Sequence, residues 1–326
     1  PRHASTHAAG VVITKNEVSS YVPLSTNDEA IVTQFTMVTL EELGLLKMDF
    51  LGLRNLTVLH DAETLVRQHT PDFSVSEIPD NDDLTFKELS LGHTAGVFQL
   101  ESQGMTSVVI GMKPQSIEDI TAIVALYRPG PMDSIPTFIA NKQDHRKITY
   151  KTPLLEPILK VTYGCIVYQE QVMQLVKKLA GFSTALADNV RYAMSKKKTQ
   201  MMQDLGQLFI HGGTWPDSGE TVPGCVNNGI PEEVAQKIYE QLDAFSQYAF
   251  NKSHAAAYAV VTYQTAYLKK YYPKEFLAGI LNDRIDKIEE ISKYLMYMKE
   301  KNIPEEKLQP QPAEVKSHFE KNRERN

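Results

Sequence analysis

The apolar pattern of the chain changes its period near residue 53, and this change limits the folds that the sequence can adopt. Three short runs of β-branched or apolar residues lie upstream, at 11–13, 30–35 and 45–51. They are separated by Ser, Thr, Asn and Asp, which is typical of strands. Downstream, apolar residues from Leu56 to Val66 recur every three or four positions, which predicts a helix. The sequence therefore predicts an α+β chain, predominantly helical, in which a short β-sheet portion is followed by a helical domain.

Helix signals continue through most of the chain. We predict helices after Ser116 and at about 167–180, 184–198, 231–246 and 254–272. Ser116 and Ser183 are expected N-caps, and Gly181 is an expected helix end. The acidic segment 70–83 and the glycine-rich segment 211–230 are predicted to be loops.

Composition places the chain among ordinary globular proteins. It has 326 residues, of which 42% are hydrophobic and 23% are charged. No apolar run approaches the ~20 residues that a membrane-spanning helix needs, so no membrane partner is expected. The only cysteines, Cys165 and Cys225, suit neither a disulfide framework nor a zinc site, which favours a reducing cytoplasm. The chain begins without Met or a leader, and we expect an internal piece of a larger protein.

Charge is distributed unevenly along the chain. The net charge is −6, yet residues 128–198 hold twelve Lys and Arg against five acids, a local balance of +7 that leaves −13 for the remainder. Such asymmetry predicts a basic face that can meet a polyanion. The alternative is a solvated helical surface.

The segment 45–51 carries the most informative pair of charged residues. In a strand, Leu46, Met48 and Phe50 share one face, which we expect to be buried on the core. Lys47 and Asp49 then share the other face. A carboxylate beside an ammonium on a rigid strand can hold a divalent metal next to a phosphate. The alternative is a surface ion pair, which contributes little.

A second candidate site is the start of the helix expected after residue 253. Asn251 or Ser253 can cap it, and its first backbone amides are expected to attract anions. Lys252 and His254 would add positive charge to such a phosphate site. Tyr258, one turn later, either packs against a base or sugar or belongs to the core. An ordinary cap with a solvated lysine is the alternative.

Further cations complete the set of candidates. Arg128 precedes Pro-Gly-Pro, a rigid turn that would aim its guanidinium at a phosphate, unless it binds the last carbonyls of its helix. The predicted DNA-binding cations lie near the end of the helix expected at 184–198: Arg191, Lys196, Lys197 and Lys198. They either follow a nucleic-acid backbone or complement the helix dipole.

Other charged clusters do not predict sites. Asp80, Asp82 and Asp83 lie in a segment that lacks a strand to fix them, and His3 and His7 lack further metal ligands nearby. The sequence contains no P-loop, no nucleophile elbow and no dinucleotide-binding glycine motif.

Five segments resemble one family in the same order along the chain. They read KMDFLGLR at 47–54, GVFQLES at 96–102, RPGP at 128–131, YQEQVM at 168–173 and FNKSHAAAY at 250–258. Together they resemble the bacterial C-family replicative DNA polymerases, the alpha subunits of DNA polymerase III. The resemblance covers residues 1 to about 290.

The resemblance implies domains, a reaction and site residues. Residues 1–52 correspond to the C-terminal part of the palm, 53–290 to the helical fingers, and 291–326 to a weakly matching tail, disordered or truncated. Asp49 matches the third of three aspartates that hold two Mg²⁺ ions, and Lys47 matches a basic residue at the triphosphate. Arg128 and Lys252, Ser253 and His254 match positions near the incoming nucleotide.

The implied function is DNA-directed DNA polymerisation, with primer–template DNA and dNTPs as substrates and, in the full-length protein, a sliding clamp and other replicase subunits as partners. The segment with the first two catalytic aspartates is absent from this sequence, so we expect the fragment to be inactive alone. A non-catalytic helical DNA-binding module and a purely structural helical scaffold are the alternatives.

Overall fold

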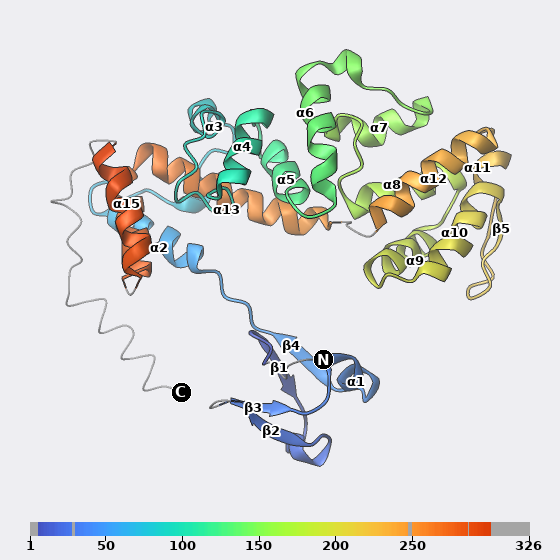
Figure 1. Cartoon of the computed structure of the whole chain (residues 1–326), viewed down its shortest axis with the longest axis horizontal. Coiled ribbons are helices and arrows are strands. Elements are labelled where there is room, and N and C mark those ends of the chain that lie inside the picture. The colour runs from blue at the N-terminus through green and yellow to red at the C-terminus, as the bar shows by residue number, and fades with distance from the viewer. Residues whose placement is uncertain (1–5, 28–29, 247–249, 286, 301–326) are drawn as a thin grey trace. The chain divides into compact units, whose positions relative to one another are not determined.

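The structure is a computed structural model that describes residues 6–27, 30–246, 250–285 and 287–300. It divides into two compact units, Pro1–Arg54, here called the strand unit, and Asn55–Asn326, here called the helical unit. Strands predominate in the first and helices in the second (Figure 1). The prediction of a predominantly helical α+β fold is confirmed.

The strand unit is built from two antiparallel strand pairs. Its elements are β1 (Gly10–Ile13), the 3-10 helix η1 (Val18–Ser20), β2 (Leu24–Asn27), β3 (Ala30–Thr33), α1 (Met37–Glu42) and β4 (Leu46–Asp49). β1 pairs with β4, and β2 pairs with β3. In the first pair, Val11 lies opposite Met48 and Val12 opposite Lys47. This pairing gives the side chains of β4 a fixed alternation.

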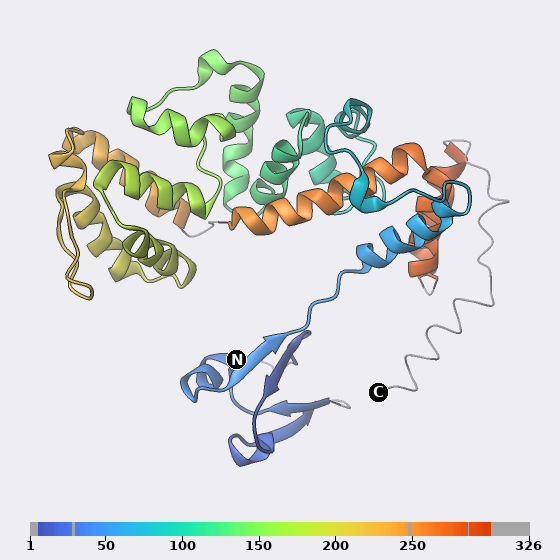
Figure 2. The same cartoon turned by 180° about the vertical axis from the view of Figure 1, so that it is seen from behind.

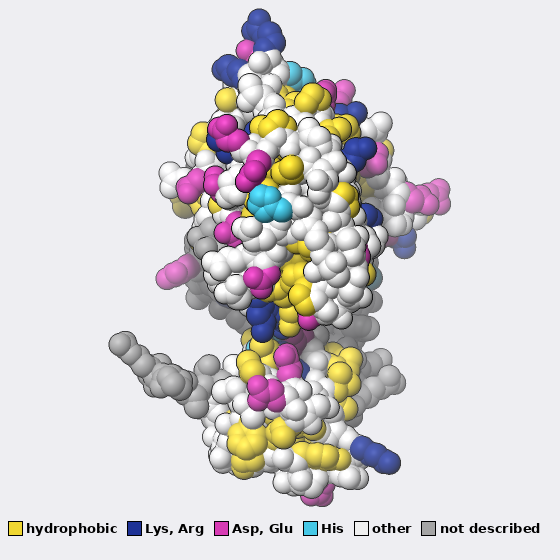
Figure 3. All heavy atoms as spheres, turned by 90° about the vertical axis from the view of Figure 1, so that its right-hand side faces the viewer, with side chains coloured by type: hydrophobic (Ala, Val, Ile, Leu, Met, Phe, Trp, Pro, Cys, Tyr) yellow, Lys and Arg dark blue, Asp and Glu magenta, His cyan; other side chains and the backbone are white. Residues whose placement is uncertain are grey.

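The apolar face of β4 is exposed, so the prediction that it is buried is wrong. Leu46 is 59% exposed, Met48 43% and Phe50 63%. Their cross-strand neighbours Val11 and Ile13 are also exposed. Hydrophobic side chains are visible on the surface of the strand unit (Figure 3). The alternation of faces was predicted correctly, but no described residue of this unit covers the apolar side of the two-stranded ribbon.

The rest of the chain is a series of helices joined by short turns. The elements are α2 (Arg54–Arg67), η2 (Val75–Glu77), α3 (Asp83–Ser90), α4 (Gln103–Met112), α5 (Ile117–Leu126), η3 (Pro131–Ser134), α6 (Ile135–Gln143), η4 (His145–Lys147), η5 (Pro153–Leu155), α7 (Glu156–Leu159), η6 (Lys160–Thr162), α8 (Gln169–Ala180), α9 (Thr184–Ser195), α10 (Thr199–His211), β5 (Gly213–Thr214), β6 (Thr221–Val222), α11 (Gly224–Asn227), α12 (Glu232–Ser246), α13 (Lys252–Tyr271), α14 (Pro273–Asp283) and α15 (Ile288–Glu300).

Three hydrophobic clusters form the core of the helical unit. One joins α7 to α12 through residues such as Leu175 and Phe209. The second joins α3 to α6 with the first part of α13, and the third joins α2, the end of α13, α14 and α15. The long helix α13 therefore contributes to two clusters, and it lies along α5 in both ribbon views (Figures 1 and 2). None of the helices in the described ranges is both long and apolar enough to cross a membrane.

Local capping signals placed three helix ends correctly. The side-chain oxygens of Ser116 and Ser183 accept hydrogen bonds from the amides of Asp119 and Leu186, which starts α5 and α9. Gly181 ends α8 with a φ of +78°, a conformation that favours glycine. These three predictions are confirmed.

Three other local predictions need correction. The segment 211–230 is not only a loop, because it contains the β5–β6 hairpin and α11. The helix expected over 184–198 ends at Ser195. In the predicted tail, residues 291–300 belong to α15, which buries Tyr294 and Met298, and residues 301–326 lie outside the described part of the chain.

Candidate functional site

The first candidate surface is the polar face of β4, where Lys47 and Asp49 lie on the same side. Nζ of Lys47 donates a hydrogen bond to Oδ1 of Asp49. The Lys47 side chain is 15% exposed, whereas that of Asp49 is 45% exposed. The hydrogen bond from Lys47 lowers the pKa of Asp49. Asp49 is therefore an ionised carboxylate that a cation or a polar ligand can reach.

Gly10 and His7 shape the other edge of this surface. Gly10 lies opposite Asp49, and a Cβ atom there would stand 2.6 Å from Cε of Lys47. Nδ1 of His7 accepts hydrogen bonds from the amides of Ala9 at 3.1 Å and Gly10 at 2.7 Å, and it lies 4.0 Å from Oδ1 of Asp49. Sequence reasoning missed Gly10, and it considered His7 only as a zinc ligand, a role that it rejected. The signal for Gly10 was a glycine at the start of a strand, which often marks a close approach.

The second candidate surface is the start of α13, where the backbone amides are already partly bound. Asn251, not Ser253, is the N-cap: its Oδ1 accepts from the amide of His254 at 2.9 Å. The amide of Lys252 donates to both carboxylate oxygens of Glu170, at 3.0 and 2.9 Å. The expectation that the first amides of the helix are open to an anion is therefore wrong for the amides of Lys252 and His254.

Arg128 lies against the segment that leads into α13. Its Cζ atom is 3.5 Å from the centre of the Phe250 ring, a cation–π contact, and burial lowers the pKa of Arg128. Phe250 forms a parallel bridge with Tyr168, and its carbonyl accepts from the amide of Gln169 at 2.9 Å. Three of the segments singled out in the sequence thus meet in one place.

The side chain of Lys252 extends over the same neighbourhood. Its Nζ lies 3.4 Å from a carboxylate oxygen of Glu118 and 5.6 Å from the centre of the Tyr168 ring. Lys252 is thus held through its backbone by Glu170 and through its side chain by Glu118. Sequence reasoning noted the segment that contains Glu170 but gave neither glutamate a role, because their partners lie far away along the chain.

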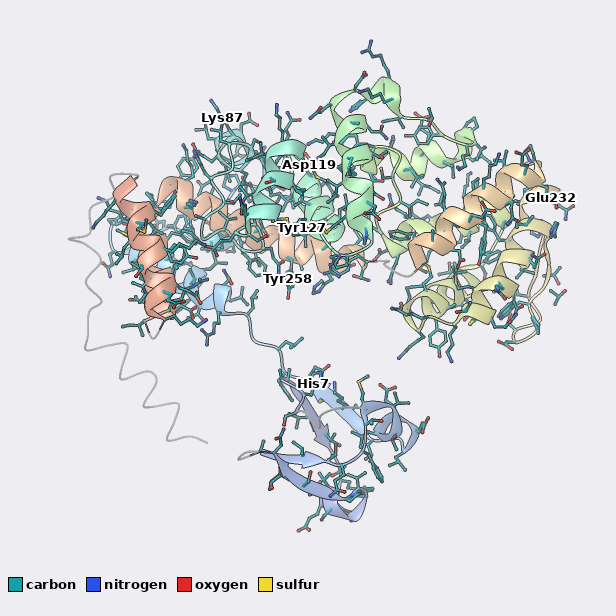
Figure 4. The ribbon with its side chains drawn as sticks, in the orientation of Figure 1. His7, Lys87, Asp119, Tyr127, Glu232 and Tyr258 are labelled. Carbon is teal, nitrogen blue, oxygen red and sulfur yellow. The ribbon has the colours of Figure 1, made fainter. Side chains whose placement is uncertain are left out.

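His254 and Tyr258 stack on each other along α13. Their ring centres are 4.3 Å apart, and the Tyr258 ring lies 5.2 Å from that of Phe98. Tyr258 projects from α13 in Figure 4 and is partly buried against the second cluster. Its packing favours a core role for Tyr258, whereas the exposed side of His254 is open to a ligand.

The remaining predicted cations lie around the α9–α10 turn. Arg191 donates to both carboxylate oxygens of Asp188, at 2.6 and 3.2 Å, which neutralises much of its charge. Lys196, Lys197 and Lys198 are exposed and form the turn itself, not the end of a helix as predicted. Lys197 and Lys198 also line an open cavity of about 1020 Å³ beside α10 and the β5–β6 hairpin.

The described residues contain no group of three or more His, Cys, Asp or Glu side chains that could hold a metal ion. Asp49 is therefore one potential metal ligand, not a complete metal site.

Comparisons with known proteins agree with the resemblance of the five segments. The family described as "Bacterial DNA polymerase III alpha subunit finger domain" matches residues 55–214, and "Bacterial DNA polymerase III alpha NTPase domain" matches residues 1–52. The chain belongs to the bacterial DNA polymerase III alpha subunit family.

Three relatives named DNA polymerase III subunit alpha illustrate the similarity. The one from Borreliella burgdorferi is 48% identical over 90% of this chain, that from Halalkalibacterium halodurans 45% over 98%, and that from Thermus aquaticus 44% over 93%. These alignments cover 25%, 28% and 24% of the relatives, so the chain spans about a quarter of their length.

Proposed function

We propose that this chain is the part of a bacterial replicative DNA polymerase that supplies one palm carboxylate and the nucleotide-binding helices of the fingers. In this reaction a primer 3′-hydroxyl attacks the α-phosphate of a dNTP and pyrophosphate leaves. The observation that carries the proposal is the ionised, exposed Asp49 beside Lys47 on a hydrogen-bonded strand, within a segment that matches the family.

Asp49 would supply one ligand to a Mg²⁺ site. An accessible carboxylate with a lowered pKa on a strand fits the hard oxygen ligands that Mg²⁺ takes. When bound, a Mg²⁺ pair lowers the pKa of the attacking hydroxyl and neutralises charge on the leaving phosphates. Lys47, which already donates to Asp49, would keep that carboxylate oriented and present its ammonium to a phosphate oxygen.

The start of α13 and Arg128 would bind the incoming nucleotide. Arg128 and Lys252 bring two cations to one neighbourhood, and Ser253 and His254 are exposed beside them. Cations positioned before the reaction stabilise the negative charge of a triphosphate without a reorganisation cost. The guanidinium of Arg128 is held in place because it stacks on the Phe250 ring.

Primer–template DNA would be contacted by the α9–α10 turn. Lys196, Lys197 and Lys198 are exposed there and free to bind phosphates, whereas Arg191 must first release Asp188. Each phosphate contact would release counterions and make binding weaker at high salt. The whole polymerase would act in the bacterial cytoplasm, with a sliding clamp and other replicase subunits as its partners.

The exposed apolar face of the β1–β4 ribbon also fits a larger polymerase. Val11, Ile13, Leu46 and Met48 would cost stability if they stayed in water. We propose that another part of the palm covers them in the full-length protein.

Substitution of Asp49 in a full-length polymerase that contains this chain tests the proposal. Asp49→Asn keeps the size of the side chain and should reduce template-directed dNTP incorporation by several orders of magnitude. Asp72→Asn, at an exposed acid in a turn, is the matched control and should retain activity. Near-normal turnover of Asp49→Asn together with weakened duplex binding of Lys196→Ala would favour the non-catalytic DNA-binding module instead.

A further inference from the structure

Glu170 occupies an unusual position at the junction of two helices. It lies in the first turn of α8, and both of its carboxylate oxygens accept the amide hydrogen of Lys252, the first residue of α13. The first amides of a helix have no acceptor within their own helix. Glu170 therefore satisfies from outside a donor that α13 cannot satisfy itself.

The contacts on either side of Glu170 extend this connection. The Gln169 amide donates to the Phe250 carbonyl, and Tyr168 forms a bridge with Phe250. Because the Phe250 ring lies under the Arg128 guanidinium, the position of α8 also sets the surface on which Arg128 rests. The short segment 168–170 thus binds both the Lys252 amide and Phe250, on which Arg128 stacks.

Charge explains why an acid suits this position. The amino ends of α8 and α13 both carry partial positive charge, and a carboxylate near them is stabilising. The charge of Glu170 also acts on Arg191. The hydrogen bond between Arg191 and Asp188 raises the pKa of Arg191, and the negative charge of Glu170 raises it further.

Two glutamates act on Lys252 in different ways, which allows their roles to be separated. Glu170 binds its backbone amide, whereas Glu118 lies 3.4 Å from its Nζ. Loss of Glu118 frees the side-chain ammonium, and loss of Glu170 frees the first turn of the helix.

We propose that Glu170 is a positioning residue for nucleotide binding, which fixes the start of α13 and the Phe250 support so that Lys252 and Arg128 face the triphosphate together. The inference rests on the proposed function. Glu170 itself touches no substrate in this scheme. It acts through the hydrogen bond that it accepts.

Steady-state kinetics of the full-length polymerase with a primer–template test this role. Loss of a hydrogen bond to a charged group should raise the dNTP KM of Glu170→Ala by about tenfold to a hundredfold, with kcat changed much less. Glu170→Gln retains an acceptor oxygen and should stay within about threefold of wild type. Glu118→Gln is the matched control and should also leave the KM within about threefold, because the helix start stays in place.

Hydrogen exchange supplies a readout independent of turnover. The peptide that contains residues 250–258 should exchange faster in Glu170→Ala than in wild type or Glu118→Gln. If Glu170→Ala does not fold, Glu170→Asp keeps the charge but shortens its reach, and it should show the same raised KM. A wild-type dNTP KM in every folded Glu170 variant overturns the proposal, as does a Glu170→Gln KM as high as that of Glu170→Ala.

These results are distinguishable from failure of the proposed function. That failure would appear as an active Asp49→Asn enzyme. If Asp49→Asn is inactive and Glu170→Ala has a normal dNTP KM, the proposed role of Glu170 is rejected and the proposed function is not.

Discussion

A buried ion pair between α5 and α6 provides the most quantitative prediction for the helical unit. Nζ of Lys142 lies 2.7 Å from Oδ2 of Asp119, and the two side chains are only 9% and 7% exposed. Asp119, which Figure 4 places on α5, also accepts from the Gln115 amide at 2.9 Å and from the Tyr163 hydroxyl at 3.3 Å. The pair therefore lies at the start of α5, beside the segment that precedes it, and it links α5 to the end of α6.

Removal of one partner leaves the other charged and buried. Replacement of Lys142 by Met should lower the free energy of unfolding by about 3–5 kcal/mol, because the Asp119 carboxylate loses its ammonium while water stays excluded. For a unit of this size, that loss corresponds to a fall of roughly 6–20 °C in Tm. Addition of Asp119→Asn to Lys142→Met should recover part of the loss, since the uncompensated charge is then gone.

Thermal unfolding of the chain, followed by circular dichroism at 222 nm, measures these differences. The control is Arg146→Met, because Arg146 pairs with Asp144 but is 90% exposed. It should shift Tm by no more than about 2 °C. If Lys142→Met unfolds within about 2 °C of wild type, the argument from buried charge is refuted.

Four further predictions concern other parts of the chain. Gly10→Ala should reduce polymerase turnover of the full-length protein, because the new methyl group displaces the Lys47 side chain, and activity equal to wild type would contradict this. Burial raises the pKa of the Cys165 thiol to about 11, so alkylation at pH 8 should be slow in the folded chain and rapid in urea. Burial opposes ionisation of Glu101, but hydrogen bonds from Lys293 and Tyr294 outweigh it and lower the pKa of Glu101 below the ordinary 4.5. Its contribution to stability is therefore complete above about pH 4.5 and is lost as pH falls further; unfolding curves between pH 6 and 3 should show this loss in wild type and not in Glu101→Gln. The 326-residue chain alone should incorporate no dNTP, and template-dependent incorporation that Asp49→Asn abolishes would contradict this prediction.

Sequence reasoning succeeded where neighbouring residues determine the structure. Ser116, Ser183 and Gly181 act on amides and carbonyls within one turn of themselves, so their effects can be read directly from the sequence. The alternation of Lys47 and Asp49 against Leu46 and Met48 is equally local, because it follows from the geometry of a single strand.

The sequence did not predict features that depend on distant partners. The exposure of Leu46 depends on how many layers cover the ribbon, which its alternation does not encode. The contact between Glu170 and Lys252 joins residues 82 positions apart. It satisfies the Lys252 amide, which local reasoning expected to be available to an anion. Asn251 and Ser253 were equally good caps in sequence terms, and only the path of the backbone selected Asn251.

The central claim is that Asp49 is a metal ligand in the polymerase reaction. A structure of the full-length polymerase with primer–template DNA, an incoming dNTP and Mg²⁺ tests it most directly. We expect a carboxylate oxygen of Asp49 within about 2.1 Å of a Mg²⁺ ion. An Asp49 carboxylate remote from both the metal and the nucleotide would contradict the account.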